Sequence, residues 1–531
     1  MQGLKTYSVK ETGDFQTPPE LAARVVNRLS RLGIRWARFL EPNCGDGNFF
    51  KGLTDTFGDT VEIRGVELQP HHVARAREAI SNAGARNAVV YTADLFRLDL
   101  RKDITWSGGG PLLVIGNPPW VTNSALGALN STNVPVKNNA RGLRGLDAVT
   151  GKSNFDTAEY VWQKLLGDLA PEKPSIALLC KLAVARKTLE YARAGNVPLK
   201  NAFIARIDGR KWFGIAADAC LLYVEVGTPA ALNEVPVFDD LDATRAGAGW
   251  GFVRDRLVAD VKGYSDAAVI DGVCPLTWRQ GLKHDAAAVM ELTLGPNGVL
   301  TNGFGEEVNI ERDFVFPLLK GTPLFKGETT HLHRFVIVPQ RRLGEDTAAL
   351  TFQAPLLWKY LSRYRAVLAH RKSSIYKTQP PFAVFGVGDY TFTNYKVAIS
   401  GLHRDPRFMA LRPHENRPIL LDDTCYFVAC RSAPQAALIA ALLSDELTTR
   451  FIKALAFPDN KRLVTKSLLQ RIDLNAVFEQ ANPGRLQARV RTELTRLGEP
   501  EPLPSLAPGS VPSDYLRDYA GNRDELSLFS R

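Results

Sequence analysis

The residues best suited to chemistry stand together in the run Asn117-Pro118-Pro119-Trp120. The two prolines fix the chain and remove backbone donors, which leaves outward carbonyl oxygens as acceptors. The side-chain oxygen of Asn117 and the carbonyl oxygen of Pro118 can accept both hydrogens of a planar amino group, and the Trp120 indole offers a flat surface for a ring. Because two acceptors would localise the nitrogen lone pair, this corner suits an aromatic amine such as that of a nucleobase.

The corner directly follows the apolar segment 112–116, which predicts a buried strand. Open α/β sheets bind ligands at the carboxyl ends of their strands. Upstream, segment 37–41 predicts another strand, and Gly45 and Gly47 follow it in a tight loop before a helix. The glycines permit close backbone approach to a ligand. The loop lacks the third glycine of a dinucleotide fingerprint, and Glu41 suits an amino-bearing ligand better than a pyrophosphate, which disfavours NAD.

Two further predicted strands lead into acidic residues. Strand 62–67 ends at Glu67, where doubly wound folds hold ribose hydroxyls. Strand 88–91 leads to Asp94, an acceptor for an adenine amino group, with Phe96 as an apolar wall. The remaining predicted elements are strands 175–182, 202–208 and 219–226 and helices 70–84, 156–169 and 184–194. The pattern predicts an α/β domain with a Rossmann-like sheet of seven strands.

Composition and charge narrow the class of protein. The 531 residues are enough for two or three domains, and the formal net charge of +10 favours a polyanionic partner such as nucleic acid. The six cysteines include no C-x-x-C pair, which gives neither a zinc pattern nor a disulfide framework and is typical of reduced thiols. No apolar run approaches the roughly 20 residues of a membrane helix, and the N-terminus lacks a signal-peptide core. We expect a soluble cytoplasmic protein.

Four motifs, in this order, resemble the gamma-class adenine-N6 DNA methyltransferases of type II restriction–modification systems, the TaqI-like enzymes among them. They are Phe15-Gln16-Thr17-Pro18-Pro19-Glu20-Leu21-Ala22, Leu40-Glu41-Pro42-Asn43-Cys44-Gly45-Asp46-Gly47, Gly65-Val66-Glu67 and Asn117-Pro118-Pro119-Trp120. The resemblance covers roughly the first two-fifths of the chain. It implies a class I methyltransferase domain, S-adenosylmethionine as cofactor and S-adenosylhomocysteine as product.

The resemblance also implies roles for single residues. The methionine part of the cofactor would contact Thr17 and the backbone of 43–47, including Asn43, Gly45 and Gly47, and its amine would contact Glu41. Its ribose would contact Glu67, and its adenine would contact Asp94 and Phe96. Asn117 would lie near the reacting groups.

Two positions depart from the family pattern or lack a clear match. Trp120 stands where the family more often has Tyr, which keeps the stacking role and removes a phenol, and Asp46 receives no role. The family places a second aromatic against the target base in a turn before a late strand, which matches Phe213. Trp212 is its rival, and a core-packing role for Phe213 remains open.

After about residue 227 the sequence pattern changes to short strand-like segments separated by Asp and Gly turns. We therefore predict three parts: a catalytic domain 1–228, a mixed α+β DNA-recognition domain 229–498 and a Pro-rich tail 499–531. Segment 121–153 reads as a long loop expected to close over DNA. Cations, aromatics and amides of the kind that grip phosphates and read bases predict DNA contacts. The predicted DNA-binding residues are Lys137, Arg141, Arg144, Arg279, Gln280, Lys283, Arg371, Lys372, Tyr395, Lys396, Lys461 and Arg462, with Lys152 in the same loop.

The sequence therefore predicts a monomeric adenine-N6 methyltransferase that flips its target base out of double-stranded DNA and needs no metal. Any cognate restriction endonuclease would be a separate chain. Two other enzyme functions stay open, methylation of adenine N6 in RNA and methylation of protein glutamine, although the N-terminal Thr-Pro-Pro-Glu segment and the large second domain argue against the latter. A non-catalytic DNA-binding subunit is the alternative from another class.

Overall fold

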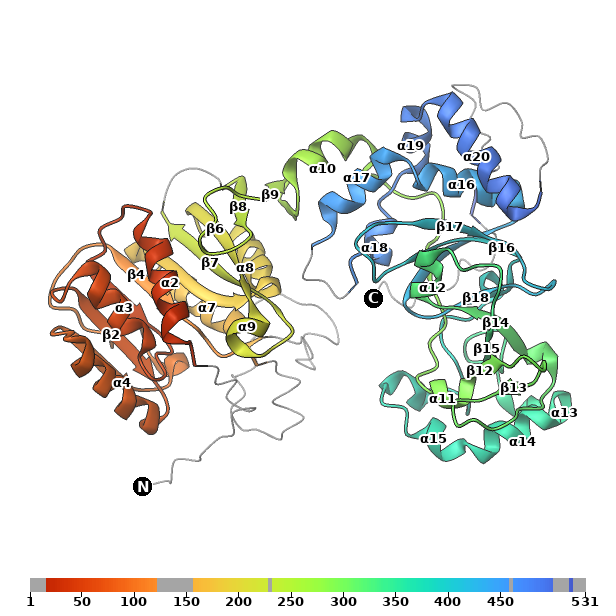
Figure 1. Ribbon diagram of the computed structural model, residues 1–531, viewed down its shortest axis with the longest axis horizontal. Coiled ribbons are helices and arrows are strands. Elements are labelled where there is room, and N and C mark those ends of the chain that lie inside the picture. Colours follow the sequence, from red (N-terminus) through yellow and green to blue (C-terminus); the bar gives the residue numbers. More distant parts are fainter. Residues whose placement is uncertain (1–15, 122–155, 228–231, 458–461, 500–514, 519–531) are drawn as a thin grey trace. The chain divides into compact units, whose positions relative to one another are not determined.

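The computed structural model describes residues 16–121, 156–227, 232–457, 462–499 and 515–518. The chain divides into two compact units, Met1–Val261 (unit 1) and Lys262–Arg531 (unit 2) (Figure 1). Each unit has its own sheet structure, as expected for a chain of this length.

Unit 1 is built on one ten-stranded sheet with the order β10-β9-β8-β6-β7-β5-β4-β1-β2-β3. Strands β1 to β5 are parallel where they pair with one another, and β7 runs antiparallel to β5 and β6. The strands are β1 (Arg38–Glu41), β2 (Glu62–Glu67), β3 (Ala88–Thr92), β4 (Leu112–Gly116), β5 (Ser175–Lys181), β6 (Leu199–Asp208), β7 (Asp218–Val226), β8 (Glu234–Phe238), β9 (Ala248–Val253) and β10 (Arg256–Val258). All seven strands predicted from the sequence are present, so the Rossmann-like prediction is confirmed.

The middle strands of this sheet are apolar on both faces. Every residue of β4 is buried, as are six of the seven in β5, and a parallel strand of this kind needs cover on both sides. The helices of unit 1 supply much of that cover: α2 (Pro19–Ser30), α3 (Asn48–Phe57), α4 (Pro70–Ala83), α7 (Thr157–Leu169), α8 (Leu182–Ala194) and α9 (Gly209–Phe213), with the 3-10 turns η1 (Leu95–Arg97) and η2 (Ala170–Glu172).

Strands β8 to β10 were missed, so unit 1 ends at Val261 rather than near residue 228. Strand β8 pairs in parallel with β6, where Ile204 lies opposite Val237, and Val235 and Val237 are fully buried. The sequence around these short strands resembles a loop-rich linker. Their partner lies well upstream in the chain, and local pattern does not reveal such a pairing.

Unit 2 contains two smaller sheets, one with the order β11-β19-β16-β17 and one with the order β13-β12-β15-β14-β18. Their strands are β11 (Arg279–Gln280), β12 (Glu291–Leu294), β13 (Leu300–Thr301), β14 (Val315–Leu319), β15 (Arg334–Ile337), β16 (Tyr395–Ser400), β17 (Phe408–Leu411), β18 (Leu420–Leu421) and β19 (Cys425–Cys430). The mixture of strands and helices agrees with the predicted α+β class.

The helix α16 (Ala433–Leu443) is apolar except for Gln435 and is buried against β16, β17 and α20 (Pro483–Leu497). The other helical elements of unit 2 are α10 (Val261–Ala267), η3 (Ala268–Ile270), α11 (Ala287–Met290), η4 (Arg312–Phe314), α12 (Gly321–Lys326), η5 (Thr347–Ala349), α13 (Leu350–Gln353), α14 (Pro355–Arg363), α15 (Arg365–Ala369), η6 (Ser374–Thr378), η7 (Asp389–Phe392), α17 (Glu446–Leu455), α18 (Lys466–Leu469) and α19 (Leu474–Gln480). Within the described ranges, no helix has the length and hydropathy that a membrane span requires.

Part of the predicted C-terminal tail packs onto unit 2. Leu516 is buried, the amide of Gln435 donates to the Tyr515 carbonyl (2.9 Å), and the backbone amide of Thr277 donates to Asp518 (3.2 Å). Residues 515–518 are therefore part of the unit, which corrects the prediction of a separate tail from 499 to 531. The proline content of the segment after residue 498 predicted a connecting tether, but it gave no information about whether the residues after that segment pack onto unit 2.

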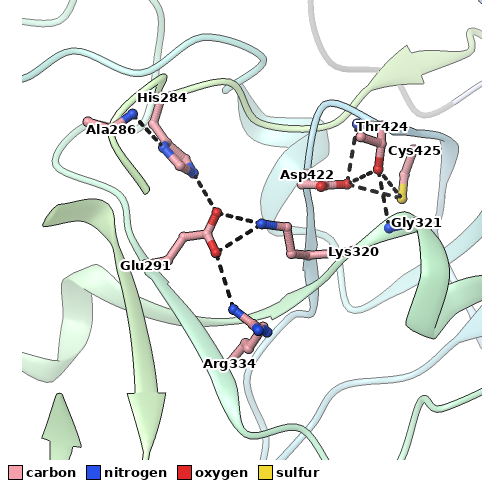
Figure 2. A network of polar contacts seen from close by, with 9 residues as sticks. All are labelled: His284, Ala286, Glu291, Lys320, Gly321, Arg334, Asp422, Thr424 and Cys425. Carbon is pink, nitrogen blue, oxygen red and sulfur yellow. Dashed lines mark hydrogen bonds and ion pairs between the residues drawn. The ribbon is translucent and has the colours of Figure 1, made fainter. Parts of the chain in front are cut away.

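A polar network in unit 2 is centred on the largely buried carboxylate of Glu291 in β12 and includes Arg334 of β15, Lys320 directly after β14, and His284 (Figure 2). Lys320 Nζ lies 2.8 and 3.0 Å from its two oxygens, His284 Nε2 lies 3.4 Å from Oε1 and Arg334 lies 3.6 Å from Oε2. Burial alone would raise the pKa of Glu291, but hydrogen bonds from His284 and Lys320 lower it to about 2. Glu291 is thus held as a carboxylate.

The substitution Glu291→Gln is expected to lower the free energy of unfolding by about 2 kcal/mol at pH 7, because Lys320 loses its partner. The folded-state pKa is depressed from 4.5 to about 2, so this stabilisation is complete above the unfolded value and disappears as the pH falls toward 2. Urea unfolding of the intact chain followed by circular dichroism measures both effects. The control is Glu328→Gln, an exposed residue 4.0 Å from Lys326, which should change little. Equal stability of the Glu291→Gln and wild-type proteins would contradict the role of the network.

Candidate active site

The Asn117-Pro118-Pro119-Trp120 corner lies at the carboxyl end of β4, in the middle of the unit 1 sheet. Strand β4 pairs with β1 on one side and β5 on the other, and this is where the strand order reverses. Gly116 packs against β1, since a Cβ atom there would meet Glu41 Cγ and Pro42 Cδ at 3.5 Å. The chain therefore enters the corner directly beside Glu41, at the kind of switch point where α/β sheets bind ligands.

Two aromatic side chains of the site, Trp120 and Phe213, are in ring-to-ring contact. The Trp120 and Phe213 ring centroids are 5.0 Å apart with planes at 63°. Trp120 is 6% exposed and its indole N–H donates to the Leu179 carbonyl (3.4 Å), whereas Phe213, at the end of α9, is only half-buried. Of the two rivals, Phe213 is the residue that contacts Trp120, while the Lys211 ammonium lies 4.4 Å from the Trp212 ring. Phe213 is thus the more accessible ring beside the corner.

The glycine loop between β1 and α3 has the backbone conformation that only glycine adopts easily. Gly45 and Gly47 have φ of +51° and +77°. A Cβ on Gly45 would lie 2.4 Å from Gln16 Oε1, and the same oxygen accepts from the Asp46 amide at 2.9 Å. The N-terminal segment that contains the buried Thr17 is therefore attached to this loop.

Glu67 joins the loop to the next helix. Its Oε2 accepts from the Gly45 amide (3.1 Å) and its Oε1 accepts from the Gln69 amide (2.7 Å) just before α4. The side chain is 9% exposed. Glu67 lies at the end of β2 as predicted, and it also orients the loop, a role the sequence did not indicate.

Two buried acceptors lie next to this loop. Glu41 is 3% exposed, and its Oε2 and the Asn43 Oδ1 accept no hydrogen bond from the described residues. Burial, followed by the negative charge of Glu67, raises the pKa of Glu41 well above its ordinary value. Buried acceptors are normally satisfied, so this pair fits a ligand that brings its own donors, above all an ammonium group.

The third strand end carries Asp94 and Phe96, also as predicted. The Asp94 carboxylate caps η1 by accepting from the Phe96 amide (3.0 Å). The Phe96 ring is 39% exposed and lies 6.5 Å from the Tyr160 ring. Except for Thr17 in the N-terminal segment, the predicted cofactor residues of unit 1 therefore lie at or just after the carboxyl ends of β1, β2, β3 and β4, or in the glycine loop.

Asp46 is a residue whose structural role sequence reasoning missed. Its carboxylate lies 2.6 Å from His72 Nδ1 and 3.3 Å from an Arg75 nitrogen, which connects the glycine loop to α4. The signal was a histidine and an arginine three residues apart on one face of a helix, a spacing that brings both side chains to the same neighbour.

Several predicted DNA contacts lie outside the described residues, namely Lys137, Arg141, Arg144, Lys152 and Lys461.

Lys396 was predicted to contact DNA, and this is wrong. It is 1% exposed, its ammonium donates to the Thr393 carbonyl (2.6 Å), and burial lowers its pKa to about 7. Cations interleaved with aromatics and amides suggested DNA contact for segment 389–396, but β16 is an inner strand paired with β17 and β19, and Lys396 is buried within it. The neighbouring Tyr395 hydroxyl donates to the Glu499 carboxylate, so this segment is tied into unit 2.

The other predicted DNA contacts are partly engaged within unit 2. Arg371 donates to the Ala383 carbonyl (2.7 Å) and lies 3.7 Å from the Tyr376 ring centroid. Arg462 pairs with Asp423 (3.0 Å), and the Gln280 amide donates to the Asp423 carbonyl (2.7 Å). Arg279 lies 4.4 Å from the Tyr390 ring centroid, the Lys283 side chain is 38% exposed, and Lys372 is exposed.

Sequence reasoning found only Arg371 and Lys372 of a longer acid-free stretch. Residues 347–388 contain no Asp or Glu and include Lys359, Arg363, Arg365, Arg371, Lys372 and Lys377. All except Arg371 are exposed, and Phe352 in the same stretch is 90% exposed. A simple scan for the spacing between acids would have found this surface. Over the parts of the chain that the structure describes, no group of three or more His, Cys, Asp or Glu is placed to hold a metal ion.

Comparison with known proteins finds a relative along most of the chain. The type II methyltransferase M.NspV from Nostoc sp. is 34% identical over 468 residues, which is 88% of this chain and 97% of that protein. The type II methyltransferase M.BanIII from Aneurinibacillus aneurinilyticus is 31% identical over 137 residues, 22% of this chain and 24% of that protein. No protein-family model matches the chain.

Among solved structures, the type IIL restriction-modification enzyme MmeI in complex with DNA covers 94% of this chain and 70% of its own, with a TM-score of 0.53 and 13% identity. At this identity the likeness concerns the fold. The match to M.NspV extends over nearly the whole of both proteins. The chain therefore belongs to the family of type II methyltransferases.

Proposed function

We propose that this protein transfers a methyl group from S-adenosylmethionine to N6 of an adenine in a specific sequence of double-stranded DNA, as the modification enzyme of a restriction–modification system. The observation that carries the proposal is the Asn117-Pro118 corner at the end of β4, near the buried acceptors of Glu41 and Asn43 and the half-buried Phe213. The corner accepts an amino group, and the loop beside it accepts a cationic ligand.

S-adenosylmethionine is the expected cofactor of this family, and the residues present fit it. Glu41 and Asn43 offer buried acceptors for its amino group, Gly45 and Gly47 leave room for the backbone to approach, and Glu67 lies at the end of β2 for ribose hydroxyls. When bound, the cofactor supplies a methyl group on a positively charged sulfur.

The protein's own contribution is to hold the adenine and its amino group. Asn117 Oδ1 and the Pro118 carbonyl accept the two N6 hydrogens, which draws the nitrogen lone pair out of the ring. Phe213, held against Trp120, packs on the base. A stacked base cannot reach a corner at the end of a buried strand, so the adenine must leave the duplex, at a cost met by DNA binding.

DNA as the substrate is supported by the chemistry of unit 2 and by the relatives. The alignment with the type II methyltransferase M.NspV covers 88% of this chain and so extends over both units. The structure of MmeI, whose fold this chain shares, was solved in complex with DNA. The stretch 347–388 gives unit 2 a cationic surface suited to phosphates. Arg363 on this surface pairs with Glu306 (2.9 Å), so Lys359 and Arg365 are the better candidates for contact with DNA.

The substitution Asn117→Ala tests the catalytic assignment. We expect kcat for methyl transfer to DNA to fall at least about 100-fold, the usual loss for one acceptor or donor aimed at developing charge, with cofactor affinity nearly unchanged. Filter-binding kinetics and calorimetry measure the two quantities. The control is Asn27→Ala, an exposed residue of α2 that should leave both unchanged. Methylation by Asn117→Ala at the wild-type rate would remove the corner from the mechanism.

The substitution Glu41→Gln tests the ammonium site. Burial and the charge of Glu67 raise the pKa of Glu41, so the neutral carboxyl persists to a higher pH than for an ordinary glutamate, whereas a cationic amine binds the carboxylate. Wild-type affinity for S-adenosylmethionine should therefore rise as the pH increases from 4.5 through the raised pKa. Glu41→Gln should bind at least about tenfold more weakly and lose this rise. Calorimetric titration of both proteins with S-adenosylmethionine across that pH range measures the affinity. The same pH dependence in the wild-type and Glu41→Gln proteins would show that Glu41 does not hold the amine.

The double substitution Lys359→Ala/Arg365→Ala tests the DNA surface of unit 2. Each lost phosphate contact should reduce the slope of log K against log salt concentration by about 0.9. Fluorescence anisotropy with a duplex oligonucleotide at several salt concentrations measures the slope. Lys200→Ala in unit 1, which pairs with Glu225, is the matched surface control. An unchanged slope in the double variant would place the DNA elsewhere. The same titration with single-stranded RNA compares the remaining nucleic-acid alternative.

A further inference from the structure

Lys181 contacts the backbone of the catalytic corner. It is the last residue of β5, and its Nζ donates to the Trp120 carbonyl (3.0 Å). The same nitrogen lies 2.6 Å from Asp156 Oδ2, just before α7. One ammonium thus joins the corner, the end of the neighbouring strand and the start of a helix.

Three more hydrogen bonds fix the surroundings of this contact. The Val121 carbonyl accepts from the Thr157 amide (2.8 Å) and the Thr157 hydroxyl (3.1 Å). The second carboxylate oxygen of Asp156 accepts from the Ala158 amide (3.2 Å), which caps α7. Asp156 is 5% exposed, so its charge is largely desolvated and needs the lysine as a partner.

The covalent structure of the corner makes this contact consequential. Pro118 and Pro119 have fixed φ angles and no N–H, so their own amides cannot bond to the neighbouring strands. With these angles fixed, the direction of the acceptors before them depends on where the chain after them is held. The carbonyl of Trp120 is the nearest following group with a hydrogen bond to a charged side chain, and that side chain is Lys181.

We propose that Lys181 is a positioning residue for methyl transfer, which holds the Trp120 carbonyl so that Asn117 and Pro118 face the amino group, and that Asp156 in turn holds Lys181. This inference rests on the proposed function of the corner. It assigns Lys181 no contact with substrate and no proton transfer. A displacement of about 1 Å at the reacting groups costs roughly a hundredfold in rate, so a loosened corner should lower kcat while binding remains.

The decisive comparison uses Lys181→Met, Lys181→Arg and the double variant Lys181→Met/Asp156→Asn. In Lys181→Met we expect kcat to fall about tenfold to a hundredfold, with KM for DNA and for S-adenosylmethionine changed less than about threefold. Lys181→Arg keeps a donor and should recover most of the rate. The double variant removes the uncompensated buried charge and should regain stability in urea unfolding, yet stay slow, because the Trp120 carbonyl still lacks its donor.

Lys164→Met is the matched control within unit 1. Lys164 has the same kind of partners, the Leu98 carbonyl (2.7 Å) and the Asp168 carboxylate (2.7 Å), and its side chain is 16% exposed. Its loss should affect stability as the loss of Lys181 does, with kcat near the wild-type value. If Lys164→Met and Lys181→Met slow the enzyme equally, or if the double variant regains full rate, the positioning role is overturned.

Hydrogen exchange separates this inference from the proposed function. The Thr157 amide, bonded to the Val121 carbonyl, should exchange faster in Lys181→Met and at the wild-type rate in Lys164→Met. If wild-type protein methylates no DNA, the proposed function fails and this exchange measurement alone judges the Lys181 contact. Unchanged exchange in Lys181→Met would overturn the contact itself.

Discussion

The parallel pairing of β4 with β1 is the constraint on which the candidate site depends. It sets Leu40 opposite Val114 and so brings the end of β1, with its buried Glu41, beside the Asn117-Pro118 corner. The proposed acceptor for a cationic amine and the proposed acceptor for a neutral amino group thereby share one edge of the sheet. Because side chains alternate between the two faces of the sheet, a one-residue shift in this register would turn each side chain of β4 to the opposite face and separate the two acceptors.

Around this pairing, different interactions hold different parts of the site. Glu67 bonds the glycine loop to the start of α4, and Asp46 bonds the same loop to His72. The corner has few donors of its own and depends on Lys181 and on the ring of Phe213. Rigid elements thus carry the acceptors, and a small number of charged contacts between elements fix their directions.

Sequence was informative where function depends on local pattern. The ends of β1 to β4, the glycine loop and the proline corner could all be placed, because apolar runs and turn residues leave a local signal. Sequence was uninformative where placement depends on distant partners. The pairing of β8 with β6, the burial of Lys396 in β16 and the contact of Lys181 with Trp120 arise from packing between segments far apart in the chain. Phe213 is an intermediate case. A local motif suggested it as the second aromatic residue of the site, but only the fold shows that its ring contacts Trp120.

Whether the corner beside Glu41 methylates adenine N6 in DNA is tested by transfer of labelled methyl from S-adenosylmethionine to unmethylated duplex DNA. Nucleoside analysis and mapping of the modified positions follow. We expect N6-methyladenine at one short sequence motif. Label on cytosine, or on RNA or protein with none on DNA, would contradict it.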